Sequence, residues 1–254
     1  MWNGDLVYLM QNLILKDFRV RYRNMSLGVL WSVLNPLVMM AVLTFVFVKI
    51  FPNNTQKHFP VFCLCGIIPF NFFALAWSSG TNSIIENVGL IKRVPVPREI
   101  VPISAVLSNC VHLAIQMGLL LAVVLVSGIG ANQQWLWLPI LWGVEVVFVC
   151  GLALASAALN VYIRDTRYVV ESFTTVLFWL VPIFYSFEII PLQYKEIYQF
   201  NPVAALVLSL RNVLLDATAP PTMTVLKLTA VSFATFFLGL TFFRRMSVMF
   251  FEHI

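Results

Sequence analysis

The fold of this chain is decided by residues 5–51, which read DLVYLMQNLILKDFRVRYRNMSLG (5–28) and then VLWSVLNPLVMMAVLTFVFVKIF (29–51). The first part repeats apolar residues at helical spacing and ends in a burst of basic ones. The second part carries no charge until Lys49. This pattern predicts an amphipathic helix over residues 1–25 that lies on a membrane surface and leads directly into a membrane-spanning helix.

The composition places the chain among polytopic membrane proteins. Its 254 residues are 60% hydrophobic and only 11% charged, and the mean hydropathy is +0.89. A soluble protein of this length would have about a quarter of its residues charged. The net charge of +5 comes from basic residues at the ends of apolar runs. That distribution is typical of contact with membrane lipid and argues against a nucleic-acid partner.

The apolar runs predict an all-α membrane protein with six transmembrane helices in one domain over residues 1–254. The spans are expected at residues 26–51, 61–84, 101–127, 136–160, 168–187 and 222–243, followed by a tail over 244–254. Before the last span, Asn201-Pro202 divides two short helical pieces, 192–200 and 203–216. Each piece is too short to span, which predicts a re-entrant hairpin on the outer face; an amphipathic loop resting on lipid is the alternative.

The basic residues orient these spans. With the amino terminus in the cytoplasm, eleven Lys and Arg fall inside and five outside, so both termini are expected in the cytoplasm of a bacterial inner membrane. The inside set is Lys16, Arg19, Arg21, Arg23, Lys92, Arg93, Arg98, Arg164, Arg167, Arg244 and Arg245. The outside set is Lys49, Lys57, Lys195, Arg211 and Lys227.

No catalytic or metal-binding constellation is apparent, so we expect a protein without enzymatic activity or metal. Cys63-Leu64-Cys65 has no histidine beside it and fits buried thiols. Glu145 lies within a span, where it is either a proton site of an ion-coupled carrier or a structural carboxyl, protonated or paired across helices. Glu171 is expected to pair with Arg167 one turn away, or with a neighbouring subunit. No phosphate-binding G-x-x-x-x-G-K-[ST] loop is present, so any ATP must be bound by a separate subunit.

Aromatic residues with polar neighbours suggest a path for sugars, because sugar C–H faces stack on rings while hydroxyls bond to amides. In the second predicted span one stripe is aromatic and the adjacent one holds Asn71, Ser78 and Asn82. The candidate path residues are Trp31, Asn35, Phe70, Phe73, Trp77, Thr81, Phe178 and Tyr185. The alternative is that these side chains serve helix packing or the membrane interface.

The loop at residues 89–102 is a candidate contact for a partner protein. Leu90, Ile91, Lys92 and Arg93 are expected to form a short helix across the cytoplasmic face, ended by Val94-Pro95-Val96-Pro97. Such a helix fits a groove on a partner. A solvated turn carrying positive-inside charges is the alternative.

Five features in this order resemble the permease subunits of ABC type-2 polysaccharide exporters, which export O-antigen, capsule and teichoic acid. They are the amphipathic basic helix with LG-x-LW-x₃-NP (27–36), LIKRVPVPRE (90–99), NVYIRDTRY (160–168), the interrupted hairpin, and FFRRMSVMFFEHI (242–254). The resemblance covers nearly the whole chain.

The resemblance implies a homodimer that forms a channel for a polyprenyl-pyrophosphate-linked polysaccharide, with two ATPase subunits docked beneath it. ATP and Mg²⁺ would bind those subunits, and this chain would hold no cofactor. Arg19, Arg21, Tyr22 and Arg23 would meet the pyrophosphate at the entrance, where arginine suits a diphosphate. Leu90, Ile91, Lys92, Arg93 and Pro95 would contact the ATPase. Three rivals are an ABC type-2 exporter of a drug, lipid or peptide, an ion-coupled carrier using Glu145, and a membrane enzyme acting on a polyprenyl phosphate.

Overall fold

The structure is a computed structural model that describes residues 6–23, 28–50, 56–93, 97–191, 193–194, 198 and 201–250. Within these ranges every regular element is a helix. The α-helices are α1 (Leu6–Tyr22), α2 (Leu30–Thr44), α3 (Phe59–Glu86), α4 (Val88–Arg93), α5 (Ile100–Val126), α6 (Leu138–Tyr162), α7 (Thr166–Leu180), α9 (Pro202–Leu214) and α10 (Thr222–Ser247). A π-helical segment, Phe45–Ile50, continues α2, and short 3₁₀ turns occupy Gln133–Trp137 and Phe187–Ile189.

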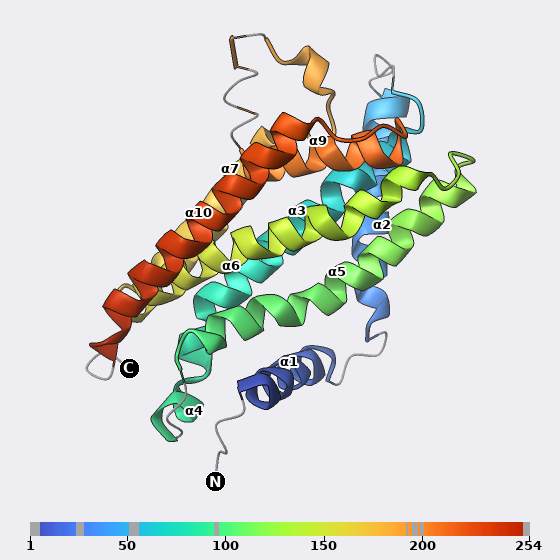
Figure 1. Cartoon of the computed structure of the whole chain (residues 1–254). Coiled ribbons are helices and arrows are strands. Elements are labelled where there is room, and N and C mark those ends of the chain that lie inside the picture. The colour runs from blue at the N-terminus through green and yellow to red at the C-terminus, as the bar shows by residue number, and fades with distance from the viewer. Residues whose placement is uncertain are drawn as a thin grey trace.

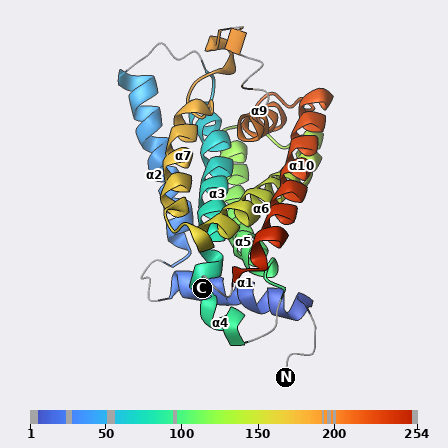
Figure 2. The same cartoon turned by 90° about the vertical axis from the view of Figure 1, so that its left-hand side faces the viewer.

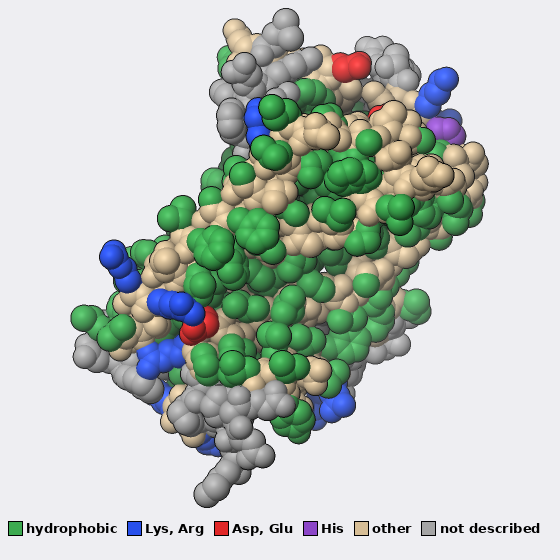
Figure 3. Space-filling view, viewed as in Figure 1, with side chains coloured by type: hydrophobic (Ala, Val, Ile, Leu, Met, Phe, Trp, Pro, Cys, Tyr) green, Lys and Arg blue, Asp and Glu red, His purple; other side chains and the backbone are tan. Residues whose placement is uncertain are grey.

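The long helices run between two ends of the molecule (Figure 1). One end, called the α1 end below, holds α1, α4 and the C-terminal end of α10; the other, the α9 end, holds α9. Figure 2 shows α1 lying across the long helices and not along them. On the face shown in Figure 3, Lys and Arg side chains gather at the two ends and a mostly hydrophobic band lies between them. This is the distribution that a membrane-spanning protein requires.

Five helical segments of the described chain are long and apolar enough to cross a membrane: Leu30–Ile50, Phe59–Glu86, Ile100–Val126, Gln133–Tyr162 and Thr222–Ser247. They coincide with the first, second, third, fourth and sixth predicted spans. The all-helical membrane fold is thereby confirmed, and the helix expected ahead of the first span is present as α1. The count of six spans is not, because the fifth predicted span contains only a shorter helix.

That helix, α7, has 15 residues and ends at Leu180, so the prediction of a helix through residue 187 is wrong in its last seven residues. The cause is local. Pro182 biases the residue before it away from the helical region, and Val181 is extended at φ −75° and ψ 135°. At 1.5 Å per residue, α7 covers about 22 Å, less than the roughly 30 Å hydrocarbon core.

The second half of the predicted hairpin is α9, which lies at the α9 end of the molecule (Figure 1). Asn201 caps it, because its side-chain oxygen accepts a hydrogen bond from the Val203 amide at 3.1 Å. Most of the first half, 192–200, lies outside the described residues. The re-entrant hairpin therefore stays a prediction.

Arg211 of α9 joins this helix to α3 and to the segment after α7. It is buried, its guanidinium carbon lies 3.4 Å from the centroid of the Phe62 ring, and it donates a hydrogen bond of 2.7 Å to the Ile183 carbonyl. Ile183 in turn presses on α3 at Gly66, where a Cβ would lie 2.9 Å from the Ile183 Cα. The break after α7, the start of α3 and α9 are thus held as one unit.

The core is built around α3, which packs against α2, α5, α6, α7 and α9. Polar side chains join α3 to α6 inside the apolar core. The Trp77 indole N–H donates to the Ser156 hydroxyl at 3.1 Å, and the Thr81 and Ser156 hydroxyls are 2.7 Å apart. Asn160 donates to the Thr81 carbonyl at 3.0 Å. Buried hydrogen bonds of this kind hold helices together in lipid, where hydrophobic association is weak.

Two glycines allow α6 and α10 to touch. A Cβ on Gly239 would lie 2.1 Å from the Gly151 carbonyl oxygen, and a Cβ on Gly151 would lie 2.6 Å from backbone atoms of Thr235 and Phe236. Any side chain at either position would collide with the backbone of the opposite helix. Small residues at helix crossings serve this purpose in membrane proteins.

At the α1 end, two sets of contacts hold the segment that contains α4. Lys16 of α1 donates to the Asn87 side-chain oxygen at 2.5 Å, just before α4 begins. After α4, Arg98 donates to the Ser247 carbonyl, and Glu99 pairs with Arg244 at 3.2 Å. The chain is therefore held in place just before α4, at Asn87, and again after it, at Arg98 and Glu99.

Candidate functional site

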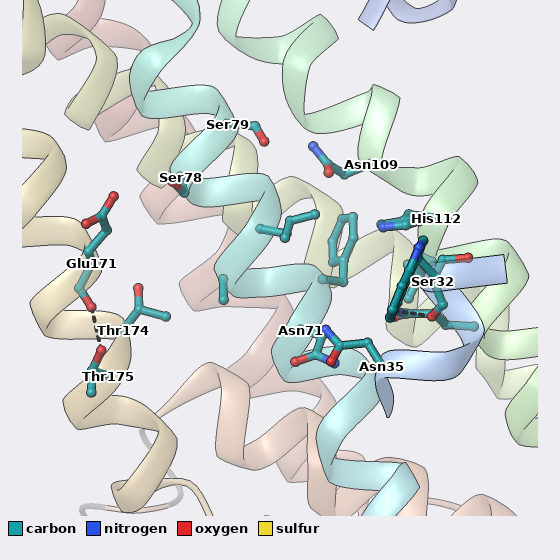
Figure 4. Close-up of a pocket in the computed structure, with 16 residues that line it drawn as sticks. Ser32, Asn35, Asn71, Ser78, Ser79, Asn109, His112, Glu171, Thr174 and Thr175 are labelled. Atoms are coloured by element: carbon teal, nitrogen blue, oxygen red, sulfur yellow. Dashed lines mark hydrogen bonds between the residues drawn. The ribbon is translucent and has the colours of Figure 1, made fainter. Parts of the chain in front are cut away.

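A groove of about 700 Å³, lined by both polar and apolar side chains, opens between α2, α3, α5 and α7. Its wall on α7 carries Glu171, Thr174 and Thr175, and the opposite wall carries Ser32, Asn35 and His112 (Figure 4). The full lining is Trp31, Ser32, Asn35, Asn71, Phe72, Ala74, Leu75, Ser78, Ser79, Asn109, His112, Leu113, Gln116, Glu171, Thr174 and Thr175. A groove with amides, hydroxyls and an aromatic ring at membrane depth is suited to a polar solute with many hydroxyl groups.

Amide side chains supply both donors and acceptors along the groove. Gln116 is buried, and its Nε2 donates to the Ser32 carbonyl at 3.1 Å, which ties α5 to α2. In the described part of the chain, the amides of Asn35 and Asn71 have no hydrogen-bond partner. Trp31 adds an indole ring that is 50% exposed. These groups can bond hydroxyls while the ring stacks on an apolar face.

The α7 wall presents a carboxylate. Thr174 and Thr175 donate their hydroxyl hydrogens to the Val170 and Glu171 carbonyls, at 2.7 and 2.9 Å. Glu171 is exposed to the groove and belongs to neither ion pair of the described residues, which are Lys16–Asp17 and Glu99–Arg244. The expected pair with Arg167 is not formed.

Arg167 contacts its neighbour in sequence instead. Its Nη2 donates to the Tyr168 hydroxyl at 2.5 Å, and its guanidinium carbon lies 4.5 Å from the Tyr168 ring centroid. The i, i+4 spacing that suggested an Arg167–Glu171 pair is therefore outweighed by a cation–π contact. Among the residues that the structure describes, no Lys or Arg forms an ion pair with Glu171.

Two of the eight predicted path residues, Trp31 and Asn35, line the groove. Phe70, Phe73, Trp77 and Thr81 are buried in the helix packing around α3. Phe178 and Tyr185 are half-buried beyond the groove, and Phe178 meets Phe70 edge to face with ring centroids 5.4 Å apart. The aromatic stripe of α3 thus packs inward, while Asn71 and Ser78 of the adjacent stripe face the groove.

The sequence interpretation missed the contribution of α5. Asn109, His112 and Gln116 line the groove, and none was a candidate. A signal was present, because Ser104, Ser108, His112 and Gln116 recur every four residues. That spacing marks one polar face on an otherwise apolar helix.

The candidate entrance residues lie on or just after α1. Arg19 and Arg23 are exposed at the α1 end, while the side chains of Arg21 and Tyr22 lie outside the described ones. A basic surface at this place can attract an anionic headgroup.

The expected short helix before the prolines is present as α4. Lys92 and Arg93 are exposed and Leu90 is half-buried, whereas Ile91 is 5% exposed and packs in a cluster with Ile84, Val101 and Leu154. Ile91 thus anchors α4 to this chain, and the two basic residues are the ones open to a partner. Pro95 lies outside the described residues.

Other candidate side chains lie away from the groove. Glu145 is 3% exposed on α6, and neither carboxyl oxygen has a hydrogen-bond partner in the described chain. The four cysteines are free thiols, with Cys63, Cys65 and Cys150 buried and Cys110 half-buried. Among the described residues, no three of His, Cys, Asp and Glu come together in a group that could hold a metal ion.

Comparison with known proteins agrees with this architecture. Residues 8–215 match the family model of the ABC-2 type transporter. The chain is 30% identical to the O-antigen export system permease protein RfbA of Klebsiella pneumoniae over 84% of this chain and 82% of the relative. It is 26% identical to RfbA of Myxococcus xanthus, over 88% and 86%, and 25% identical to the polysialic acid transport protein KpsM of Escherichia coli, over 91% of each. A match over most of the chain, to relatives whose full length it nearly spans, identifies it as a member of the ABC-2 type transporter family of membrane permeases.

Proposed function

We propose that this chain is the transmembrane subunit of an ATP-driven exporter that moves a polyprenyl-pyrophosphate-linked polysaccharide, of the O-antigen kind, across the bacterial inner membrane. The observation that carries the proposal is the groove between α2, α3, α5 and α7. Its amides and hydroxyls match sugar hydroxyls, and Trp31 offers a ring for stacking. The relatives named as O-antigen permeases support the same substrate class.

Two copies would complete the path. Of the residues of α2, only Ser32 and Pro36 are buried, and the groove beside this helix is open along its side. A transmembrane helix with so little protein around it must be covered by lipid or by another subunit. A second copy placed against α2 and α7 would close the groove into a channel and shield its polar lining from lipid.

ATP would be hydrolysed by two separate subunits bound at the α1 end, with both termini in the cytoplasm. Lys92 and Arg93 of α4 are exposed there, and the chain is held on both sides of this helix, which suits a part that transmits motion. Replacing both with Glu should reduce copurification of the ATPase subunit. Arg245→Glu is the matched control, because Arg245 is exposed on α10 at the same end.

The direct test is export. Cells lacking this gene should accumulate lipid-linked polysaccharide inside, and the intact gene should restore it to the surface only with an ATPase partner whose Walker motif is intact. Normal surface polysaccharide in the deleted cells would refute the function.

The entrance is tested separately. Arg19→Ala with Arg23→Ala should weaken the stimulation of ATP hydrolysis by the lipid-linked substrate in proteoliposomes, because arginine binds diphosphate strongly. Arg245→Ala should not. Stimulation that stays at the native level in the double variant would remove these residues from the entrance.

One observation favours the rival function of an ion-coupled carrier: both carboxyl oxygens of Glu145 are buried without a hydrogen-bond partner in the described chain. Such a carboxyl is a candidate proton site. It does not line the groove. If the exporter proposal holds, Glu145→Gln should retain ATP-dependent export. Loss of transport with normal ATP hydrolysis would favour the carrier.

A further inference from the structure

We infer that this permease is selective for an uncharged polysaccharide, and that Glu171 is the residue that excludes polyanionic chains. The inference rests on the proposed export function and adds the charge class of the polymer. It is carried by the chemistry of the groove lining between α2, α3, α5 and α7.

The groove lining is poor in cations. Glu171 is the only Asp, Glu, Lys or Arg among the described residues that line it, and His112 is the other titratable side chain. Proteins that bind carboxylates, sulfates or phosphates tightly do so with Arg and Lys side chains, which form charge-assisted hydrogen bonds. A polyanion in this groove would meet a carboxylate and, among the described lining residues, no Arg or Lys.

The negative charge of Glu171 is not compensated by an ion pair with any residue that the structure describes. Arg167, one turn away, is engaged with Tyr168 through a hydrogen bond of 2.5 Å and a cation–π contact. The Thr175 hydroxyl donates to the backbone carbonyl of Glu171 and leaves its carboxylate free. Beside protein walls, where the effective dielectric constant is lower than in bulk water, an uncompensated charge acts more strongly than it does in water.

The remaining lining favours hydroxyl groups without charge. Asn35 and Asn71 each present a donor and an acceptor, which matches a sugar hydroxyl that also does both. Trp31 presents a ring face that carries partial negative charge, so it attracts C–H groups and repels anions. The amides, the indole ring and the carboxylate therefore all favour an uncharged polymer over an anionic one.

The first experiment measures the charge of the groove without any substrate. A cysteine is placed at Thr175, four residues from Glu171 and therefore about 5–6 Å from it on the helix surface. The full chain in membranes is labelled at about pH 8, to keep histidine uncharged, with a cationic and an anionic methanethiosulfonate reagent. The chain without the added cysteine gives the background from native thiols.

The expected result is that the cationic reagent reacts faster, and that Glu171→Gln lowers the cation-to-anion rate ratio by at least about threefold. Glu188→Gln, which removes an exposed carboxylate outside the groove, should leave the ratio unchanged. Equal rates for both reagents, or a ratio insensitive to Glu171→Gln, would overturn the inference. If the Thr175 variant does not fold, Ser78→Cys on α3 reports from within the same groove.

The second experiment measures export by the complete exporter in cells. Two polymers of similar length are supplied, one of neutral hexoses and one with a uronic acid in every repeat. The native chain should export the neutral polymer preferentially, and Glu171→Gln and Glu171→Lys should raise the ratio of anionic to neutral polymer at the surface, the second by more. An unchanged ratio, or native preference for the anionic polymer, refutes the selectivity. If the native chain exports neither polymer, both the proposed export function and the proposed substrate class are refuted. The ratio of labelling rates would still report the charge of the groove.

Discussion

Polar side chains within the membrane-spanning helices either join two helices or line the groove. Neighbouring residues on one helix can take different roles. Trp77 of α3 donates to Ser156 and is buried, whereas Ser78, the next residue, lines the groove. One residue along a helix is a turn of about 100°, enough to move a side chain from the packed face to the open one. Residue type alone therefore does not separate the polar groups that join helices from those that face a substrate.

The α3–α6 hydrogen bonds lead to a prediction about stability. Ser156→Ala removes the acceptor of the Trp77 indole N–H and the partner of the Thr81 hydroxyl. We expect a loss of about 1 kcal/mol in the free energy of unfolding, the usual size for interhelical hydrogen bonds in membranes. Thermal denaturation of the purified protein measures it. Ser172→Ala, at an exposed position on α7, is the control and should have little effect; equal stability of both variants would contradict the role of Ser156.

At the scale of whole helices, packing is set by where backbones can approach. α6 and α10 cross at Gly151 and Gly239, and α3 approaches α6 at Gly80, where a Cβ would lie 2.4 Å from the Ala153 Cβ. α7 ends at Leu180 for a different reason, the conformational restriction that Pro182 imposes on Val181. The short helices at the two ends, α4 and α9, are held in part by buried side chains such as Ile91 and Arg211.

The crossing of α6 and α10 at two glycines leads to a prediction about stability, with a second glycine-to-alanine substitution as a control that should not destabilise the protein. Gly239→Ala should destabilise the protein by about 3 kcal/mol, because its methyl group would overlap the Gly151 carbonyl oxygen. Gly118→Ala on α5 has no atom within 4 Å of the new methyl group and should be neutral or stabilising by up to about 1 kcal/mol. The melting temperatures of the two variants and the native protein in detergent test this prediction. A Gly239→Ala protein as stable as the native one would show that α6 and α10 are not in contact.

At the scale of the whole molecule, the distribution of exposed surface points to assembly. α2 forms one edge of the groove and is poorly buried, and α7 forms the other edge with Phe173, Val176 and Trp179 exposed. Figure 2 shows these two helices on the same side of α3. The groove and the least covered helices therefore share one face, as expected if a second copy completes the path.

This arrangement can be tested by crosslinking. A cysteine at Val38 on α2, a position that is 53% exposed, should give a disulfide-linked dimer on mild oxidation in membranes. A cysteine at Leu226 on α10, which is 66% exposed on a helix away from the groove, should give far less. The native chain controls for its own thiols. Dimer formation at Leu226 but not at Val38 would place the subunit contact on the wrong face for the proposed channel.

Much of the fold could be predicted from the sequence because a transmembrane helix is defined locally. The apolar runs that predicted the spans at 61–84 and 101–127 became α3 and α5 with ends shifted by no more than two residues. The short helix before the prolines became α4. The helical end at Leu180 could have been anticipated from Pro182, but the apolar run past it masked the signal.

The candidate site was predictable only in part, because the tertiary structure decides which side chains of a helix line the groove and which pack inward. Trp31 and Asn35 were identified, but Phe70, Phe73, Trp77 and Thr81 turned out to pack inward. Composition cannot distinguish an aromatic that lines a path from one that fills a core, since both occur on apolar helices.

The sequence by itself determined that this is an all-helical membrane protein, where most of its spans lie, and that a basic surface helix precedes the first of them. Each of these is set by the hydropathy and charge of a single segment. Only the tertiary structure decided that Asn35, Asn71, Gln116 and Glu171 meet in one groove. They come from four helices, and no local rule fixes how four helices rotate about their axes; that is set by contacts such as Gly151 with Gly239 and Trp77 with Ser156, which the chain makes only when it is packed.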